Sequence, residues 1–335
     1  MKVLSSCLRR HKGVLMIFKA IRMPLGRHHF GMVRILAGLW IGLVFSSSVA
    51  GSEAHSDEVE PSSSTLDITN PGSDLANFPN SAYTLPQGGF YLETTPISYT
   101  SASKRSSPQY NAEYLLRYGL LDDIEVRLYS QGFTVQGNPN KAVGFSPLTF
   151  DTKIHFWDEW EDYYLPAAGL EVLLQTDLLG SPAFNAGLQP AMSLNFDQTL
   201  PYEFEIEYNV GAARFQDPQN LDKSVWDATF SWAIQRAMTE DIDLFINGYY
   251  NASSLPRNTR HSDKYQHVCP NAGPCRDVEK IRRAIEPGAN VQMQAVGMGG
   301  IWTMDKHTVF FTNLAAGVST STPDFTGYVG FAWTP

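Results

Sequence analysis

The sequence predicts an all-β protein, an antiparallel transmembrane β-barrel of about twelve strands, preceded by a signal peptide and a disordered lead-in. Three observations lead to this prediction. Extended segments alternate between apolar and polar residues, the connections between them alternate between long and short, and the chain begins with an export signal. The expected organisation is a signal region at 1–50, a flexible periplasmic lead-in at 51–88 and the barrel at 89–335.

The first fifty residues have the composition of a secretory signal. They contain eight Lys or Arg residues and no acidic residue, and an apolar run at 35–45 is followed by Ser48-Val49-Ala50. A basic flank, a short apolar core and small residues before the cleavage point predict cleavage after Ala50. The apolar run is too short to cross a bilayer, which takes about 20 residues. A buried core helix is the alternative, and Met23 or Met32 are alternative translation starts.

Removal of the signal leaves a strongly acidic protein. Without those eight basic residues, 17 basic residues stand against 34 acidic ones, a net charge of −17. Nucleic-acid binding is not expected, because it depends on clustered Lys and Arg side chains. The expected partners are outer-membrane lipid and a small-molecule solute, and we expect no cofactor, metal or catalytic residue.

The two remaining cysteines predict a disulfide in a long external loop. Cys269 and Cys275 lie in the turn-rich sequence Cys-Pro-Asn-Ala-Gly-Pro-Cys, which can close in an oxidising compartment. A metal site would need more ligands, and His261 and His267 stand in no recognised spacing. The loop at 253–288 is interpreted as a solvated surface loop, with closure over the pore mouth as the alternative.

Twelve segments carry the apolar and polar alternation of strands that have two unlike faces. They are 89–99, 109–119, 123–135, 146–157, 164–178, 186–200, 202–215, 224–238, 242–252, 290–304, 307–319 and 325–334.

The connections between these segments follow the rule for bacterial barrels. Every second connection is short, and the others are longer, as expected when tight periplasmic turns face larger external loops. Aromatic residues gather near both predicted rims, which is the interfacial signature of membrane barrels. The predicted location is therefore the outer membrane of the cell.

The clearest alternation lies at 202–214. Apolar residues fall on one face of this predicted strand, whereas Glu203, Glu205 and Glu207 fall on the other, about 7 Å apart along the strand. No base in the adjoining strands neutralises all three carboxylates, and an unpaired acidic row is tolerable only in water. The row therefore predicts a hydrated lumen that favours cations or polar solutes.

Four further charged residues are predicted to face the lumen on neighbouring strands. They are Glu113, Arg117, Glu125 and Arg127. Opposite charges across two strands contribute about 0.2–1 kcal/mol per pair, so we interpret these residues mainly as a structural set of ion pairs.

Several stretches resemble a bacterial outer-membrane, transporter-like family named for the MetA pathway of phenol degradation. The hairpin at 116–127, Leu-Arg-Tyr-Gly-Leu-Leu-Asp-Asp-Ile-Glu-Val-Arg, is similar to that family's "LRYGLTDRLELR" hairpin, and 78–93 and 317–333 resemble its first strand region and closing hairpin. The resemblance implies a channel or uptake role without shared catalytic residues. It also implies the barrel assembly machinery as a partner, although this chain ends Trp333-Thr334-Pro335 rather than on an aromatic residue.

The sequence thus predicts a passive channel for uptake or efflux of small solutes, aromatic or cationic in character. One alternative is a soluble exported β-protein that binds a ligand. A barrel enzyme is the other, but no nucleophile stands beside a base in a recognisable motif.

Overall fold

The computed structural model describes residues 66–102, 107–138, 141–184, 187–217, 220–251, 293–319 and 322–335, and for 215–225 it describes no side chain. The chain divides into a unit at 1–63 and a unit at 64–335, and all described residues belong to the second. The predicted signal region and the Cys269–Cys275 pair lie outside the described residues. No helix in the described ranges is both long and apolar enough to cross a membrane.

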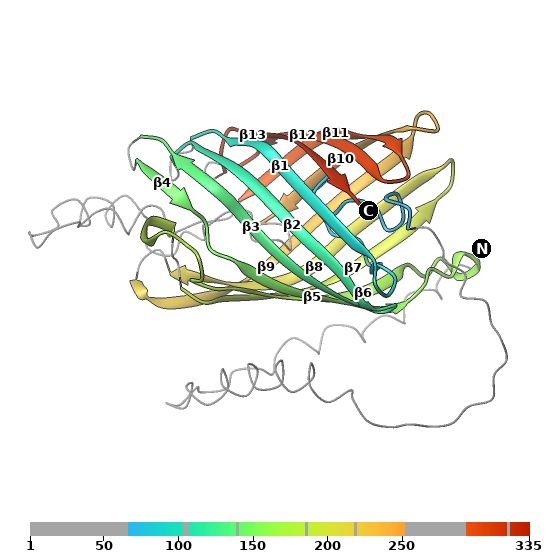
Figure 1. Ribbon diagram of the computed structural model, residues 1–335, viewed down its shortest axis with the longest axis horizontal. Coiled ribbons are helices and arrows are strands. Elements are labelled where there is room, and N and C mark those ends of the chain that lie inside the picture. Colours follow the sequence, from blue (N-terminus) through green and yellow to red (C-terminus); the bar gives the residue numbers. More distant parts are fainter. Residues whose placement is uncertain are drawn as a thin grey trace, which may run out of the picture. The chain divides into compact units, whose positions relative to one another are not determined.

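Twelve long strands form a closed antiparallel barrel in the described part of the chain (Figure 1). They are β1 (Phe90–Thr100), β2 (Gln109–Leu121), β3 (Ile124–Gln136), β5 (Thr149–Trp157), β6 (Ala167–Gln175), β7 (Gln189–Leu200), β8 (Phe204–Asp217), β9 (Asn220–Ala237), β10 (Ile242–Tyr250), β11 (Gln294–Asp305), β12 (Thr308–Gly317) and β13 (Phe325–Trp333). The ring closes because β1 pairs with β13, and β2 pairs with β3. The predicted fold class is confirmed, and each predicted segment matches one strand.

A short additional strand, β4 (Ala142–Phe145), pairs with the outer end of β3. The sequence predicts a connection at these residues, because four residues that include a glycine carry too little alternation to indicate a strand. Two short 3-10 helices, η1 (Glu161–Tyr163) and η2 (Pro182–Phe184), lie in other connections.

The strand with the clearest alternation begins later than predicted. β8 starts at Phe204, whereas Tyr202 and Glu203 lie in the turn after β7 with φ angles of 68° and 62°. This left-handed backbone is uncommon for residues other than glycine and reverses the chain within three residues. Glu203 is therefore an exposed turn residue, and the prediction that it belongs to a row on the strand is wrong.

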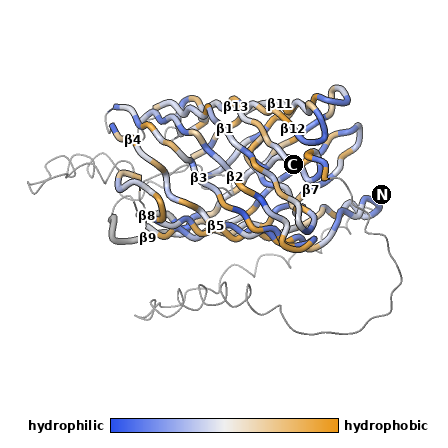
Figure 2. Tube along the Cα trace, in the orientation of Figure 1, coloured by the Kyte–Doolittle hydropathy of each residue, from blue (hydrophilic) through white to orange (hydrophobic). Residues whose placement is uncertain are grey.

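The barrel wall has an apolar outer face and a largely polar inner face, whereas a soluble protein has polar residues outside and apolar residues inside. Val210, Leu194 and Ile246 point outward, with 49%, 42% and 48% of their surface exposed. Lys153 and Glu171 point inward and are fully buried. Figure 2 shows the resulting alternation of apolar and polar residues along the strands. A closed barrel satisfies its own backbone hydrogen bonds, so this apolar outer surface is suited to lipid.

Exposed aromatic residues lie at both ends of the strands. Trp157, Trp302 and Trp333 are exposed at the end where the short connections lie, and Trp226 and Phe325 are exposed at the opposite end. In bacterial barrels the short turns face the periplasm. Both β1 and β13 have their free ends at this short-turn end, since Leu92 pairs with Trp333.

Residues 66–88 are packed inside the barrel, and we call them the luminal segment. The sequence predicts a flexible lead-in at these residues, and for them that prediction is wrong. From Asp74 to Asn80 every residue is buried. Within the wall, a Cβ atom on Gly169 would lie 2.7 Å from the carbonyl oxygen of Ala82 and one on Gly119 would lie 2.0 Å from that of Pro86, so these glycines let the segment's backbone approach closely.

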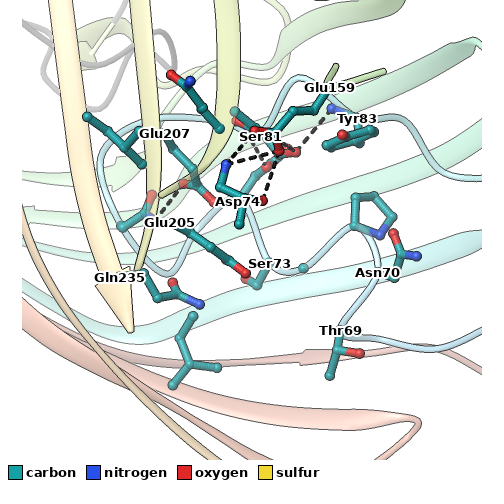
Figure 3. Close-up of a pocket in the computed structure, with 18 residues that line it drawn as sticks. Thr69, Asn70, Ser73, Asp74, Ser81, Tyr83, Glu159, Glu205, Glu207 and Gln235 are labelled. Atoms are coloured by element: carbon teal, nitrogen blue, oxygen red, sulfur yellow. Dashed lines mark hydrogen bonds between the residues drawn. The ribbon is translucent and has the colours of Figure 1, made fainter. Parts of the chain in front are cut away.

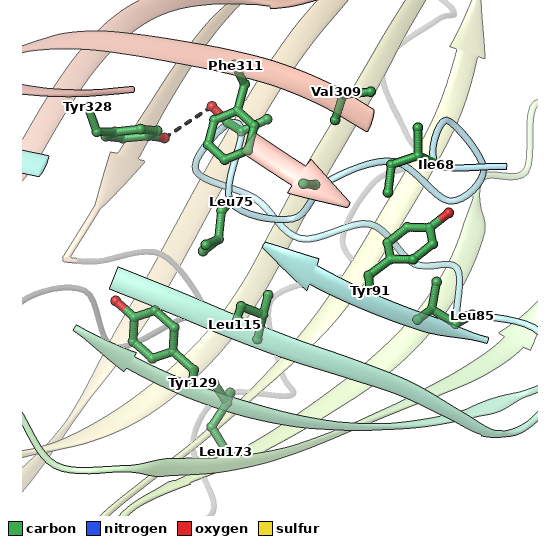
Figure 4. Close-up of a cluster of buried hydrophobic side chains, with 12 residues drawn as sticks. Ile68, Leu75, Leu85, Tyr91, Leu115, Tyr129, Leu173, Val309, Phe311 and Tyr328 are labelled. Carbon is green, nitrogen blue, oxygen red and sulfur yellow. Dashed lines mark hydrogen bonds between the residues drawn. The ribbon is translucent and has the colours of Figure 1, made fainter. Parts of the chain in front are cut away.

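Apolar residues of the luminal segment join the inward-facing apolar residues of the wall (Figure 4). Ile68, Leu75 and Leu85 are at most 1% exposed and form one cluster with wall residues. The wall residues of this cluster include Tyr91, Leu115, Tyr129, Leu173, Val309, Phe311 and Tyr328. Burial of a side chain the size of leucine contributes about 1.5–3 kcal/mol, so these contacts hold the segment in place.

Replacement of Val210 by arginine tests the outward face. Val210 lies near the middle of β8 and pairs with Leu194 and Phe230. We expect Val210→Arg to lower the free energy of unfolding by about 2–4 kcal/mol in phospholipid vesicles, because a charge near the bilayer midplane is poorly solvated. Urea titration of the reconstituted protein measures this loss. Tyr202→Arg is the matched control, because Tyr202 lies in a turn and is 84% exposed. An equal loss of stability in both variants would contradict lipid contact at Val210.

Candidate functional site

The centre of the lumen holds three cations that share one carboxylate of the luminal segment. Asp74 Oδ2 lies 2.6 Å from Lys153 Nζ, 3.1 Å from Arg127 Nη2 and 3.5 Å from Arg117 Nη1. All four side chains are at most 3% exposed. Burial by itself raises the pKa of Asp74, but the charges of Arg117, Lys153 and Arg127 outweigh burial and lower this pKa well below its ordinary value. Asp74 is therefore an ionised anchor.

The two arginines also bind carboxylates of the wall. Arg117 lies 2.6 Å from Glu125 and 2.9 Å from Glu93. Arg127 lies 2.8 Å from Glu171 and 3.2 Å from Asp151. These contacts link β1, β2, β3, β5 and β6. Among the described residues, the carboxylate that lies within 4 Å of Lys153 Nζ is that of Asp74, in the luminal segment.

The structure thus brings together some of the predicted lumen residues and separates others. Arg117, Glu125 and Arg127 belong to the central cluster, and Arg127 also lies 3.6 Å from Glu125. Glu113 is 6% exposed and accepts a hydrogen bond of 2.8 Å from the Tyr129 hydroxyl, so it stands apart from the two arginines.

The predicted acidic row is divided by the structure. Glu203 is in the turn, Glu205 is exposed at the short-turn end, and Glu207 accepts a hydrogen bond of 2.8 Å from the Asn77 amide. The neutral partner of Glu207 comes from the luminal segment rather than from a base on an adjoining strand. The acidic row predicts a hydrated lumen, and a barrel of twelve strands predicts a narrow or partly plugged one. The buried central cluster agrees with the second expectation at the centre of the lumen.

Wall carboxylates also accept hydrogen bonds from the backbone of the luminal segment. The backbone amides of Leu75 and Leu85 donate to Glu93 and Glu125, at 2.8 and 2.9 Å. The Ala82 amide donates to Asp197 at 2.9 Å. Because the segment has little regular secondary structure, its backbone donors need such partners when they are buried.

An asparagine pair joins the luminal segment to the far wall. The side-chain amide of Asn80 donates to both oxygens of Glu171 at 2.8 Å, and its backbone amide donates to Asn209 Oδ1 at 2.6 Å. Asn209 Nδ2 donates in return to the Asn80 carbonyl at 2.8 Å. The segment therefore binds β6 and β8 as well as the charged cluster.

A cavity of about 260 Å³ lies beside the luminal segment, toward the short-turn end (Figure 3). One side consists of segment residues that include Ser73, Asn77 and Tyr83, and the other includes Glu205 and Glu207 of β8. Neither Lys, Arg nor His occurs among its described lining residues. The cavity is therefore an acidic chamber next to the closed centre of the lumen.

Several residues of this site are absent from the sequence-based set of candidates. Asp74 and Asn80 lie in a stretch without periodicity, and Glu93 and Glu171 resemble other inward polar residues of the strands. The signal in the sequence that 66–88 can be buried is that large apolar residues recur through this otherwise polar segment. They are Ile68, Leu75, Phe78 and Leu85. Among the described residues, no group of three or more His, Cys, Asp or Glu side chains is arranged to hold a metal ion.

A closed antiparallel barrel with an apolar outer belt and a charged interior defines a transmembrane β-barrel of the outer-membrane type. Searches with family models and against curated proteins give no match for this chain.

The chain is similar to several solved structures, each at 10% identity or less. An outer membrane channel from Pseudomonas putida F1 has a TM-score of 0.48 at 10% identity, over 77% of this chain and 99% of that one. The NanC porin has a TM-score of 0.42 at 8% identity, over 73% and 99% of the two chains. The outer membrane channel DcaP of Acinetobacter baumannii has a TM-score of 0.29 at 9% identity, over 71% and 70%.

Replacement of Asp74 by asparagine tests the anchor. The variant leaves the buried Lys153 without its carboxylate, and loss of one partner of a buried ion pair costs about 3–5 kcal/mol. We expect the backbone amides of Leu75 and Leu85 to exchange with deuterium about a hundredfold faster or more, since each 1.4 kcal/mol corresponds to about tenfold.

Asp67→Asn is the matched control for this measurement, because the Asp67 side chain is exposed and bonds only locally, to Thr69. Hydrogen exchange followed by mass spectrometry on the refolded barrel reports both variants. Unchanged protection in Asp74→Asn would show that the ion pairs do not hold the segment.

Proposed function

We propose that this protein is an outer-membrane channel for small solutes, which the luminal segment holds closed and whose open form favours cations. The observation that carries the proposal is the position of the luminal segment inside a closed barrel, on a wall lined with charged and polar side chains. Eight-stranded barrels are filled by their own side chains, whereas barrels of 16–18 strands leave an open pore. Twelve strands leave room for a chain segment, and its departure would leave a path for water.

The chemistry of the contacts supports two states of the segment. Arg117, Arg127 and Lys153 are buried and paired when the segment is docked. Once the segment leaves, water can solvate these side chains, so the open state does not carry the cost of unpaired buried charge. The free-energy difference between the two states is then set largely by the contacts of Asp74, Asn80 and the apolar cluster.

The acidic chamber supports a preference for cations. Asp197, Glu205 and Glu207 line it, and in the described part of the chain none of them has a Lys, Arg or His partner within 4 Å. A cleft lined by charge of one sign concentrates ions of the other sign. Small cationic or aromatic solutes fit this proposal, and so does the resemblance to the phenol-degradation family. Insertion by the barrel assembly machinery is part of the same proposal.

Single-channel recording in planar bilayers tests closure by the segment. We expect the native protein to conduct rarely. Asp74→Asn should raise the open fraction by about a hundredfold or more, because the lost ion pairs stabilise the closed state by about 3–5 kcal/mol. Asp67→Asn should match the native protein. If Asp74→Asn and the native protein are equally open, closure by this anchor is excluded.

Reversal potentials in a salt gradient test the charge preference. We expect the open channel of Asp74→Asn to prefer cations at neutral pH, and we expect the added change Glu205→Gln to reduce that preference while heat-modifiable gel migration stays unchanged. Glu205 is exposed at the chamber and none of the described hydrogen bonds involves its carboxylate, so its replacement leaves the wall intact. Anion preference would overturn this part of the proposal, and liposome swelling with sugars, amino acids and simple phenols would rank the solutes.

A further inference from the structure

The acidic chamber contains a pair of carboxylates that face each other across two strands. Asp197 of β7 and Glu207 of β8 are direct register partners. Side chains in such a pair have Cβ atoms about 4.5–5.5 Å apart, and like charges at this distance destabilise the sheet. Glu205 follows two residues along β8, about 7 Å from Glu207. A cation bound beside Asp197 and Glu207 would offset the repulsion between their carboxylates.

Two residues that line the chamber also carry buried acceptor atoms for which the described residues provide no donor. Asn77 lines the chamber and is 3% exposed, and its Oδ1 has no hydrogen-bond partner among the described residues. Its Nδ2 donates to Glu207, which fixes the amide beside the carboxylate. Asp197 Oδ2 accepts from Ser81 Oγ at 2.6 Å and from the Ala82 amide, whereas no described donor reaches the buried Asp197 Oδ1. A buried acceptor without a donor destabilises the structure.

We propose that the chamber is a binding site for a small organic ammonium ion, a primary amine with a short apolar chain. An ammonium group carries three donors and no acceptor, which matches a set of carboxylate and amide oxygens. Tyr83, Pro71 and Ile301 provide less polar lining for the chain. The cavity of about 260 Å³ is far larger than a bare ion needs, since one water occupies about 30 Å³ of liquid.

A divalent metal fits the chamber less well than an ammonium ion. The described residues contain no group of three or more His, Cys, Asp or Glu side chains in an arrangement that could hold a metal. The neighbouring Asp74 is already paired with Lys153 and so contributes no free charge. The site deepens the proposed function, on which it rests, because it places a solute-binding step on the short-turn side of the closed centre.

Isothermal titration calorimetry on the refolded full-length protein in detergent tests the site. The probe is n-butylammonium at neutral pH, with butan-1-ol and butyrate as neutral and anionic analogues of the same length. We expect binding of the ammonium ion alone. Glu207→Gln and Glu205→Gln should each weaken it by about tenfold or more, because a hydrogen bond to a charged group contributes about 1.5–3 kcal/mol.

Glu203→Gln is the matched control, because it removes the same charge from the adjacent turn without touching the chamber, and it should change the affinity less than about twofold. Glu205→Gln keeps the test valid if Glu207→Gln fails to show heat-modifiable migration. Binding of butan-1-ol with equal affinity, an equal effect of Glu203→Gln, or tighter binding of Mg²⁺ than of the amine would each overturn the proposal.

Calorimetry does not require conduction, so the two proposals can fail separately. A protein that binds butylammonium at this site but never conducts in bilayers refutes the channel and leaves the site. A protein that conducts and prefers cations but gives no heat with butylammonium refutes the site and leaves the channel.

Discussion

The pairing of buried charge at the centre of the lumen is the constraint on which the rest of this structure depends. Three cations of the wall, Arg117, Arg127 and Lys153, are withdrawn from water, and such charges are stable only with close partners. Wall carboxylates supply part of this pairing, and Asp74 completes it from outside the barrel sequence. The closed lumen is therefore a property of the barrel and the luminal segment together.

This arrangement separates two parts of the lumen by their electrostatics. In the centre, opposite charges are in contact and buried. Toward the short-turn end, Asp197, Glu205 and Glu207 share a chamber without a basic residue among its described lining. The luminal segment forms the boundary between the two parts, because Asp74 faces the cations and Asn77 faces Glu207. The segment thus supplies a carboxylate to the cations on one side and a neutral hydrogen-bond donor to Glu207 on the other.

The barrel could be predicted from the sequence because its signals are local. Alternation along a strand and the length of the next turn are both visible within a dozen residues, and each predicted segment matches a strand. The luminal segment could not be predicted in this way, since its partners are remote in the chain. Asp74 and Lys153 are 79 residues apart, and Asn80 and Asn209 are 129 apart. The polar composition of 66–88 predicts disorder for a segment in water. The same composition is compatible with an ordered segment when polar wall residues inside a barrel bind it.

Glu203 and Glu207 show, at one strand, that sequence periodicity does not reveal strand ends or distant partners. Their spacing is identical relative to Glu205, yet Glu203 lies in a left-handed turn and Glu207 lies against Asn77. The periodicity of side chains assigns faces, but it does not fix where a strand begins or which distant residue meets it. Likewise, Arg117 and Glu125 are neighbours in a hairpin and could be paired from the sequence, whereas the contact of Arg127 with Glu171 joins strands that are not adjacent.

The contacts of the luminal segment depend on closure of the barrel. The segment precedes β1 in the chain, but its partners lie on strands from β1 to β13, including Glu93, Glu171, Asn209 and Tyr328. Its docking surface therefore exists only after the last strand has closed on the first. A segment that precedes every strand of the barrel in the sequence thus has its complete binding surface only when the first and last strands are paired.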